Sequence, residues 1–151
     1  MKILMFFFFI GFVQNNAISQ CTVITAPWLD GFESHTLGPI PVNDPGNSQC
    51  WESPAYEPDW TVQNIPPLQW YLVPFEGIYH CYLETSTGPG TDYLESPEID
   101  IHSLSSPQLT FHYYMYGAGM GTMSVEVWDG TTWSAPIWSL SGQQQTSVND
   151  P

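Results

Sequence analysis

The carboxylates are the side chains of this chain with the clearest potential for chemistry. Four of them, Asp30, Glu33, Asp59 and Glu84, lie at the ends of expected elements or in the segments beside them. Hard cations such as Ca²⁺ bind several converging carboxylate and carbonyl oxygens. These four acids are therefore candidate calcium ligands, and the alternative is that they are solvated loop residues. No Asp-x-Asp-x-Asp-Gly string of the EF-hand type occurs.

Other catalytic or metal-binding patterns are weak. The four histidines are dispersed and have no His-x-His or His-x-x-x-His spacing, which does not favour zinc. The chain has no Gly-x-Ser-x-Gly elbow, and no fixed cation lies beside a cysteine to lower its pKa. Glycoside hydrolysis by a pair of carboxylates stays an open alternative, because the distance between the two carboxylates decides whether they can act together.

Aromatic side chains offer a second kind of site. Seven tryptophans and eight tyrosines are many for 151 residues, and exposed rings can stack on sugars. We interpret most of them as packing residues. Trp70 and Tyr71, close to Pro66 and Pro67, are the best candidates for an exposed carbohydrate-stacking pair.

The N-terminus has the features of a secretory leader. Lys2 precedes a short apolar run, and Ala17-Ile18-Ser19 is an acceptable cleavage site. We therefore expect a signal peptide over 1–19, cleaved after Ser19, and a domain over 20–151. The alternative is a lipoprotein acylated at Cys21, which Gln20 does not favour, because such sites prefer a small residue before the cysteine. Because the remaining chain has no Lys or Arg and keeps all 15 acids, nucleic acid and anionic membranes are poor partners for it.

Three cysteines in a secreted chain predict one disulfide and one free thiol. Cys21 and Cys50 flank a span over 36–48 that is rich in Pro, Gly and Asn, so we predict that these two pair. Cys81 lies within an alternating run, and we expect a buried free thiol there.

Alternating runs predict an all-β domain, and no segment has a helical period. The clearest runs lie over 108–116 and 121–128 and are joined by a Gly-x-Gly-x-Gly connection. Phe111, Tyr113 and Met115 of the first run and Met123, Val125 and Val127 of the second would share a core face. The Asp129-Gly130 pair predicts a hairpin turn. Further strands are expected over 59–64, 78–85, 92–96 and 132–140.

The central segment, from Phe111-His112-Tyr113-Tyr114-Met115-Tyr116 through Gly117-Ala118-Gly119-Met120-Gly121, resembles the MAM domain, the family of meprin, neuropilin and a receptor tyrosine phosphatase. Other elements resemble that family in the same order. They are Asp30-Gly31-Phe32-Glu33, Asp59-Trp60, Tyr82-Leu83-Glu84-Thr85-Ser86, Leu94-Glu95-Ser96-Pro97, Trp133 with Ile137-Trp138, and Ser141-Gly142-Gln143-Gln144. The likeness begins near residue 29 and continues to the end of the chain.

The resemblance implies an antiparallel jelly-roll β-sandwich. The family continues with further strands, so we expect the domain to lack its last strands. Glu33 matches the family's acidic residue that helps to hold a structural cation, and Asp30, Asp59 and Glu84 are its expected companions.

The resemblance also implies a secreted or cell-surface, non-catalytic adhesion or accessory domain. Such a domain contacts extracellular proteins and belongs to a larger multidomain protein. The alternative is a calcium-assisted carbohydrate-binding module that engages a polysaccharide through Trp70 and Tyr71.

Overall fold

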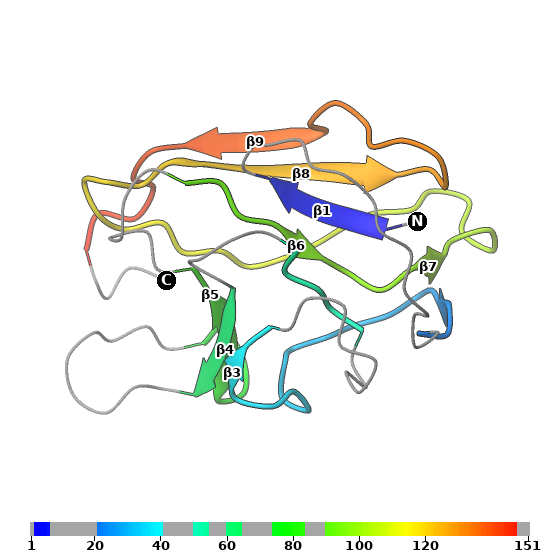
Figure 1. The fold of residues 1–151 in the computed structure, drawn as a ribbon, viewed down its shortest axis with the longest axis horizontal. Coiled ribbons are helices and arrows are strands. Elements are labelled where there is room, and N and C mark those ends of the chain that lie inside the picture. Colours follow the sequence, from blue (N-terminus) through cyan, green and yellow to red (C-terminus); the bar gives the residue numbers. More distant parts are fainter. Residues whose placement is uncertain are drawn as a thin grey trace.

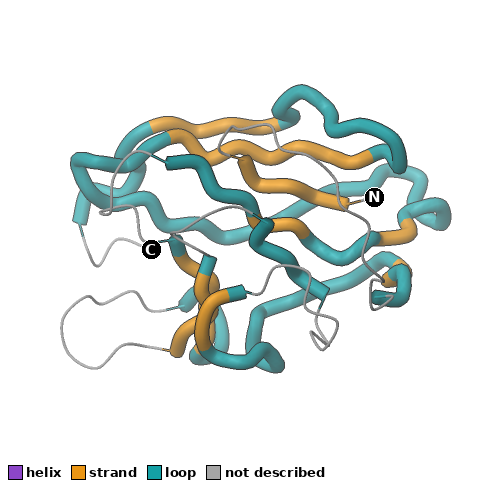
Figure 2. The backbone as a smooth tube through the Cα atoms, in the orientation of Figure 1, coloured by secondary structure: helices purple, strands orange, loops and turns teal. Residues whose placement is uncertain are grey.

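The computed structural model describes residues 2–6, 21–40, 50–54, 60–64, 74–83 and 90–147. Throughout this part of the chain the ordered elements are β-strands, and Figure 2 shows strands and loops without a helix. None of the described residues belongs to a helix that could cross a membrane. The all-β expectation is confirmed.

The largest sheet contains four antiparallel strands in the order β6-β1-β8-β9. These strands are β6 (Leu94–Glu95), β1 (Lys2–Phe6), β8 (Thr122–Trp128) and β9 (Trp138–Ser141). Figure 1 shows them side by side in one layer. Lys2–Phe6 lies inside the predicted leader, so sequence reasoning did not expect it as a strand. The predicted cleavage site after Ser19 lies outside the described residues.

Two smaller groups of strands complete the fold. A three-stranded antiparallel sheet has the order β3 (Gly38–Pro39), β4 (Thr61–Asn64) and β5 (Tyr79–Tyr82). In Figure 1 this sheet runs at a steep angle to the large one. A short parallel pair joins β2 (Ile24–Thr25) to β7 (Ile99–Asp100).

The turn after β8 forms as predicted. Asp129 Oδ1 accepts hydrogen bonds from the backbone N–H groups of Thr131 and Thr132, both at 2.8 Å. Gly130 has a φ of 102°, which a side chain would disfavour. The returning chain comes back beside β8, where Ser134 N–H donates to Val127 O at 2.9 Å. Regular pairing of β9 begins only at Trp138, so the predicted strand over 132–140 is shorter than expected.

The core consists of two clusters. The first contains Ala26, Ile99 and Val125, with Phe111 and Trp138 packed against it. The second contains Ile40, Val62 and Leu94, and half-buried rings and the Cys81 side chain pack around it. Val125 is completely buried, which fits the predicted inward face of β8.

The predicted strand over 108–116 does not form. Leu109 and Tyr113 are exposed, Phe111 is half-buried, and only Met115 is buried as expected. The predicted hairpin between 108–116 and β8 is therefore wrong, because β8 pairs with β1 and β9 instead.

Glutamine side chains replace strand pairing along the end of this segment. The Gln145 side chain accepts from Met115 N–H at 2.6 Å and donates to Tyr113 O at 3.3 Å. Gln143 Oε1 accepts from Gly117 N–H at 3.3 Å. Side-chain amides thus satisfy the N–H groups of Met115 and Gly117 and the carbonyl of Tyr113, whereas Met115 O accepts from the backbone N–H of Gln144 at 2.7 Å.

Candidate functional site

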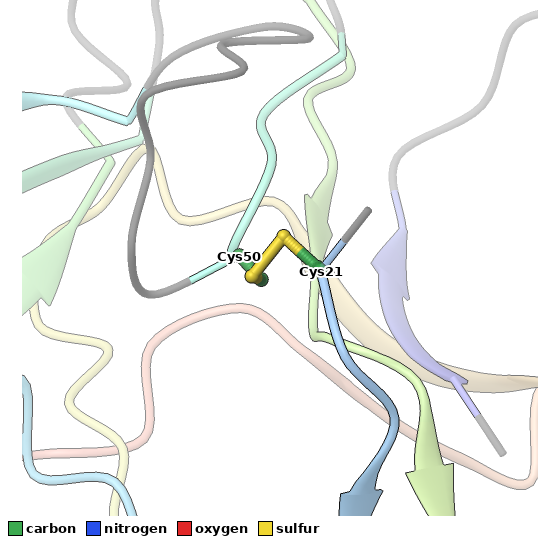
Figure 3. Close-up of a disulfide and its surroundings, with 2 residues drawn as sticks. All are labelled: Cys21 and Cys50. Carbon is green, nitrogen blue, oxygen red and sulfur yellow. A yellow bond between two sulfur atoms is a disulfide. The ribbon is translucent and has the colours of Figure 1, made fainter. Parts of the chain in front are cut away.

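A disulfide closes the region that contains Asp30 and Glu33, two of the four predicted calcium ligands. Cys21 and Cys50 are bonded, with their Cα atoms 5.6 Å apart (Figure 3). The predicted pairing is confirmed, and Cys81 is a free cysteine, also as predicted. Because Trp51 follows Cys50 directly, the disulfide fixes the chain that carries the Trp51 ring.

Asp30 binds three hydrogen-bond donors. Its Oδ1 accepts from Phe32 N–H at 2.8 Å. Its Oδ2 is 2.8 Å from Trp51 Nε1, which donates to it, and 2.9 Å from His35 Nε2. Burial raises the pKa of Asp30, but the hydrogen bonds from His35, Phe32 and Trp51 outweigh burial and hold the pKa below its ordinary value.

The rings around Asp30 form a packed wall. The Phe32 ring centroid lies 4.9 Å from that of His35 and 5.2 Å from that of Trp51. Phe32 has a φ of 63°, a left-handed conformation that is uncommon for a non-glycine residue. The Asp30 bond to Phe32 N–H and the ring contacts therefore hold a backbone conformation that Phe32 would not adopt readily by itself.

Glu33 connects the same loop to β5. Its Oε1 accepts from the backbone N–H groups of Ile78 and Tyr79, at 2.8 and 2.7 Å. The preceding Gly77 has a φ of 68°, and a Cβ built there would fall on the Glu33 carboxylate, 2.5 Å from Cδ. The close approach of the carboxylate to the backbone therefore requires glycine at position 77.

The four predicted calcium ligands are only partly placed. Both Asp30 oxygens accept hydrogen bonds. The hydrogen bonds between Glu33 and described residues all go to Oε1, so Oε2 is the Glu33 oxygen that a cation could contact. Asp59 and Glu84 lie outside the described residues. Among those that are described, no three His, Cys, Asp or Glu side chains gather as a metal-binding group. One Glu33 oxygen thus makes no hydrogen bond to a described residue, both Asp30 oxygens serve as hydrogen-bond acceptors, and the calcium site stays a prediction.

Asp92 is a buried acid that the sequence did not identify as a site residue. Asp92 is 2% exposed, and its Oδ1 accepts from the Ser53 hydroxyl at 3.2 Å and from Tyr93 N–H at 2.7 Å. Burial raises the pKa of the Cys81 thiol, and the negative charges of Asp92 and Asp30 raise it further. A thiol in this setting stays protonated, which disfavours nucleophilic chemistry at Cys81.

Aromatic residues gather on the surface along 112–116. The Phe75 ring stacks on His112 with their centroids 3.3 Å apart, and the Tyr114 and Tyr116 centroids are 6.2 Å apart. Phe75 is 70% exposed and Tyr116 38%. We call Phe75, His112, Tyr114 and Tyr116 the aromatic strip. Trp70 and Tyr71, the predicted sugar-stacking pair, lie outside the described residues.

The aromatic strip is also tied to the end of the described chain. The Tyr114 hydroxyl donates to Ser147 O at 3.1 Å. Sequence reasoning placed 112–116 in a core hairpin, so it missed this surface. The alternation of that segment was its only signal, and alternation does not show which face is covered. No family model matches the chain, and no solved structure matches it.

Proposed function

We propose that this chain is a secreted, non-catalytic domain of the MAM type, with a jelly-roll sandwich, that contacts other extracellular proteins as one module of a larger protein. The collinear motifs from Asp30 to Gln144 support this family. The Cys21–Cys50 disulfide also supports it, because disulfides persist in oxidising compartments such as the extracellular space.

The aromatic strip is the observation that carries this proposal. Exposed apolar and aromatic surface is a common mark of protein contact sites, and tyrosine in particular is enriched in them. The backbone beneath the strip is fixed by the Gln143 and Gln145 amides and by the bond from Tyr114 to Ser147. Little conformational entropy would then be lost when a partner binds.

The charge of the domain indicates the kind of partner. After Lys2 the chain has no Lys or Arg, and it carries 15 acids. A basic protein surface would be attracted to it over distances up to the screening length and would associate faster at low salt. We therefore expect an aromatic contact at the strip with complementary positive charge around it.

Cell adhesion to a surface coated with the full chain tests the proposal. The variant Phe75→Ser/Tyr116→Ser should lose most adhesion. The matched control Leu29→Ser/Ile137→Ser removes two residues that are 80% and 62% exposed elsewhere, and it should keep adhesion. Equal adhesion by the two variants would contradict a role for the strip.

A glycan array probed with and without calcium tests the alternative function. Calcium-dependent binding to a polysaccharide, lost in Trp70→Ala/Tyr71→Ala, would replace protein contact by carbohydrate binding. The proposed function predicts no glycan ligand on the array.

A further inference from the structure

Phe75 presents an open aromatic face to solvent. Its ring lies nearly parallel to that of His112, with an interplanar angle of 9° and the centroids 3.3 Å apart. This stacking covers one face of the Phe75 ring, yet 70% of the residue is exposed. The exposed area must therefore include the other face of the ring. The face of an aromatic ring carries partial negative charge and attracts a cation placed above it.

The turn over 75–78 that carries this ring also brings carboxylates together. Glu76 follows Phe75 directly. A Cβ built on Gly31 would lie 3.5 Å from Glu76 Oε1 and 4.0 Å from Glu33 Cγ, so both acidic side chains approach Gly31. The sequence has no Lys or Arg after residue 2, so no side chain of the turn or of its neighbouring loop carries a fixed positive charge. Because like charges repel, a cation from outside the chain is favoured here.

Hydrogen bonds hold the 75–78 turn in place before any partner binds. Glu33 Oε1 accepts from Ile78 N–H and Tyr79 N–H, at 2.8 and 2.7 Å, where the turn leads into β5. The loop that carries Glu33 is itself held by Asp30, which accepts from Trp51 Nε1 next to the disulfide. A cation that binds at the turn therefore meets a backbone that is already fixed, and little conformational entropy is lost.

We propose that the 75–78 turn binds an arginine side chain of the extracellular protein partner. The guanidinium stacks on the open face of Phe75, and the Glu76 carboxylate accepts hydrogen bonds from its N–H groups. Arginine fits better than lysine, because a guanidinium is planar and weakly hydrated, whereas an ammonium is a compact, strongly hydrated charge. This inference rests on the function proposed above, since it names the chemistry of the protein that meets the aromatic strip.

Three short peptides test the site on the full chain with its disulfide intact. Each is an N-acetylated, C-terminally amidated tripeptide with glycine at both ends and arginine, lysine or citrulline in the middle. Citrulline keeps the planar shape of arginine and lacks its charge. Binding is followed by NMR, through the ring protons of Phe75 and His112 and the amide of Gly77.

The order of the three affinities reports the chemistry of the site. The arginine peptide should bind about fivefold tighter than the citrulline peptide, which loses the attraction of the ring and of the carboxylate for a charge. It should bind about twofold tighter than the lysine peptide, whose ammonium cannot stack as a plane. Added salt should weaken the two basic peptides and leave the citrulline peptide nearly unaffected.

Variants separate the ring from the charge. Phe75→Leu keeps an exposed apolar side chain but removes the aromatic face, so the arginine peptide should lose its advantage over the lysine peptide. Glu76→Gln should weaken both basic peptides about twofold and leave their order unchanged. The matched control Glu98→Gln removes the same charge from an exposed position beside β7, and it should leave the three affinities nearly unchanged.

Competition in the adhesion assay connects the site to the partner. At a concentration that fills the site, the arginine peptide should reduce adhesion to the full chain, and the citrulline peptide should not. An arginine peptide that binds no tighter than citrulline or lysine, or equally well to Phe75→Leu, would overturn the site. Strip-dependent adhesion that persists with the site filled would overturn the arginine of the partner. Peptide binding needs no cell, so these failures are distinct from equal adhesion by the two serine variants, which contradicts the proposed function.

Discussion

Gly77→Ala is expected to break the connection between Glu33 and β5. An alanine at a φ of 68° adopts a left-handed conformation that costs about 1–2 kcal/mol. Its Cβ would also occupy the place of the Glu33 carboxylate and push that group away from Ile78 N–H and Tyr79 N–H. At this exposed position water partly replaces the lost bonds, so each is worth about 1 kcal/mol.

Gly77→Ala should therefore lower the free energy of unfolding by about 3–4 kcal/mol, a large part of the ~5–15 kcal/mol that stabilises a typical domain. Gly142→Ala is the matched control. Gly142 has a φ of 74° and no atom within 4 Å of its built Cβ, so this change costs only the backbone strain. The loss in free energy of unfolding should be larger for Gly77→Ala than for Gly142→Ala by about 2 kcal/mol, which is the contribution of two hydrogen bonds.

Urea unfolding followed by tryptophan fluorescence measures both changes. In a Glu33→Ala background the carboxylate is already gone, and Gly77→Ala should then cost no more than Gly142→Ala. Equal costs for the two glycine variants in the wild-type background would refute the role assigned to Glu33.

Four further measurements test the core, the acids and the cation. Leu94→Ala, at a residue that is 4% exposed, should cost about 2–5 kcal/mol in urea unfolding, whereas Leu109→Ala, at 41% exposure, should be mild. The pKa of Asp30 is lower in the folded than in the unfolded chain, so the ionised Asp30 stabilises the fold at high pH. This stabilisation is lost as the pH falls from the unfolded-state pKa through the folded-state pKa. Asp30→Asn should therefore flatten the fall in melting temperature below about pH 4. The pKa of Glu126 is raised, so its charged form is disfavoured in the fold; Glu126→Gln should raise the melting temperature at pH 7, and the gain should vanish below about pH 4. Sodium chloride should raise the melting temperature by screening the acids, and calcium at equal ionic strength should raise it further; equal shifts, or a calcium excess that survives in Glu33→Gln, would count against Glu33 as a ligand.

Local patterns predicted the elements that local physics controls. The extent of β8 was predicted closely, and Met123 and Val125 are buried as expected, but Ser124 and Glu126 on the opposite face are buried as well. The turn at Asp129 was predicted because the Asp side chain binds the backbone two and three residues later. The disulfide was predicted because its two cysteines flank the Pro-, Gly- and Asn-rich span over 36–48, although the short strand β3 lies within that span.

Features that depend on distant partners were not predictable in the same way. The segment over 108–116 alternates like a strand, but the Gln145 side chain, 30 residues later, accepts from Met115 N–H. Periodicity carries no information about such partners. Trp51 donates to Asp30 across 21 residues, so the sequence identified Asp30 as an acid but not as the acceptor at a ring-walled site. Residues 2–6 were predicted as part of a leader, whereas in the structure they pair as a strand, and this pairing does not test cleavage of the leader.

Enzymatic stripping of the target cell surface tests the central claim most directly. Cells that bind to the immobilised full chain are treated either with protease or with glycosidases, and adhesion is measured again. Protein contact through the aromatic strip predicts that protease treatment abolishes adhesion and that glycosidases leave it unchanged. Adhesion that survives protease and disappears with glycosidases would contradict the account and favour carbohydrate binding.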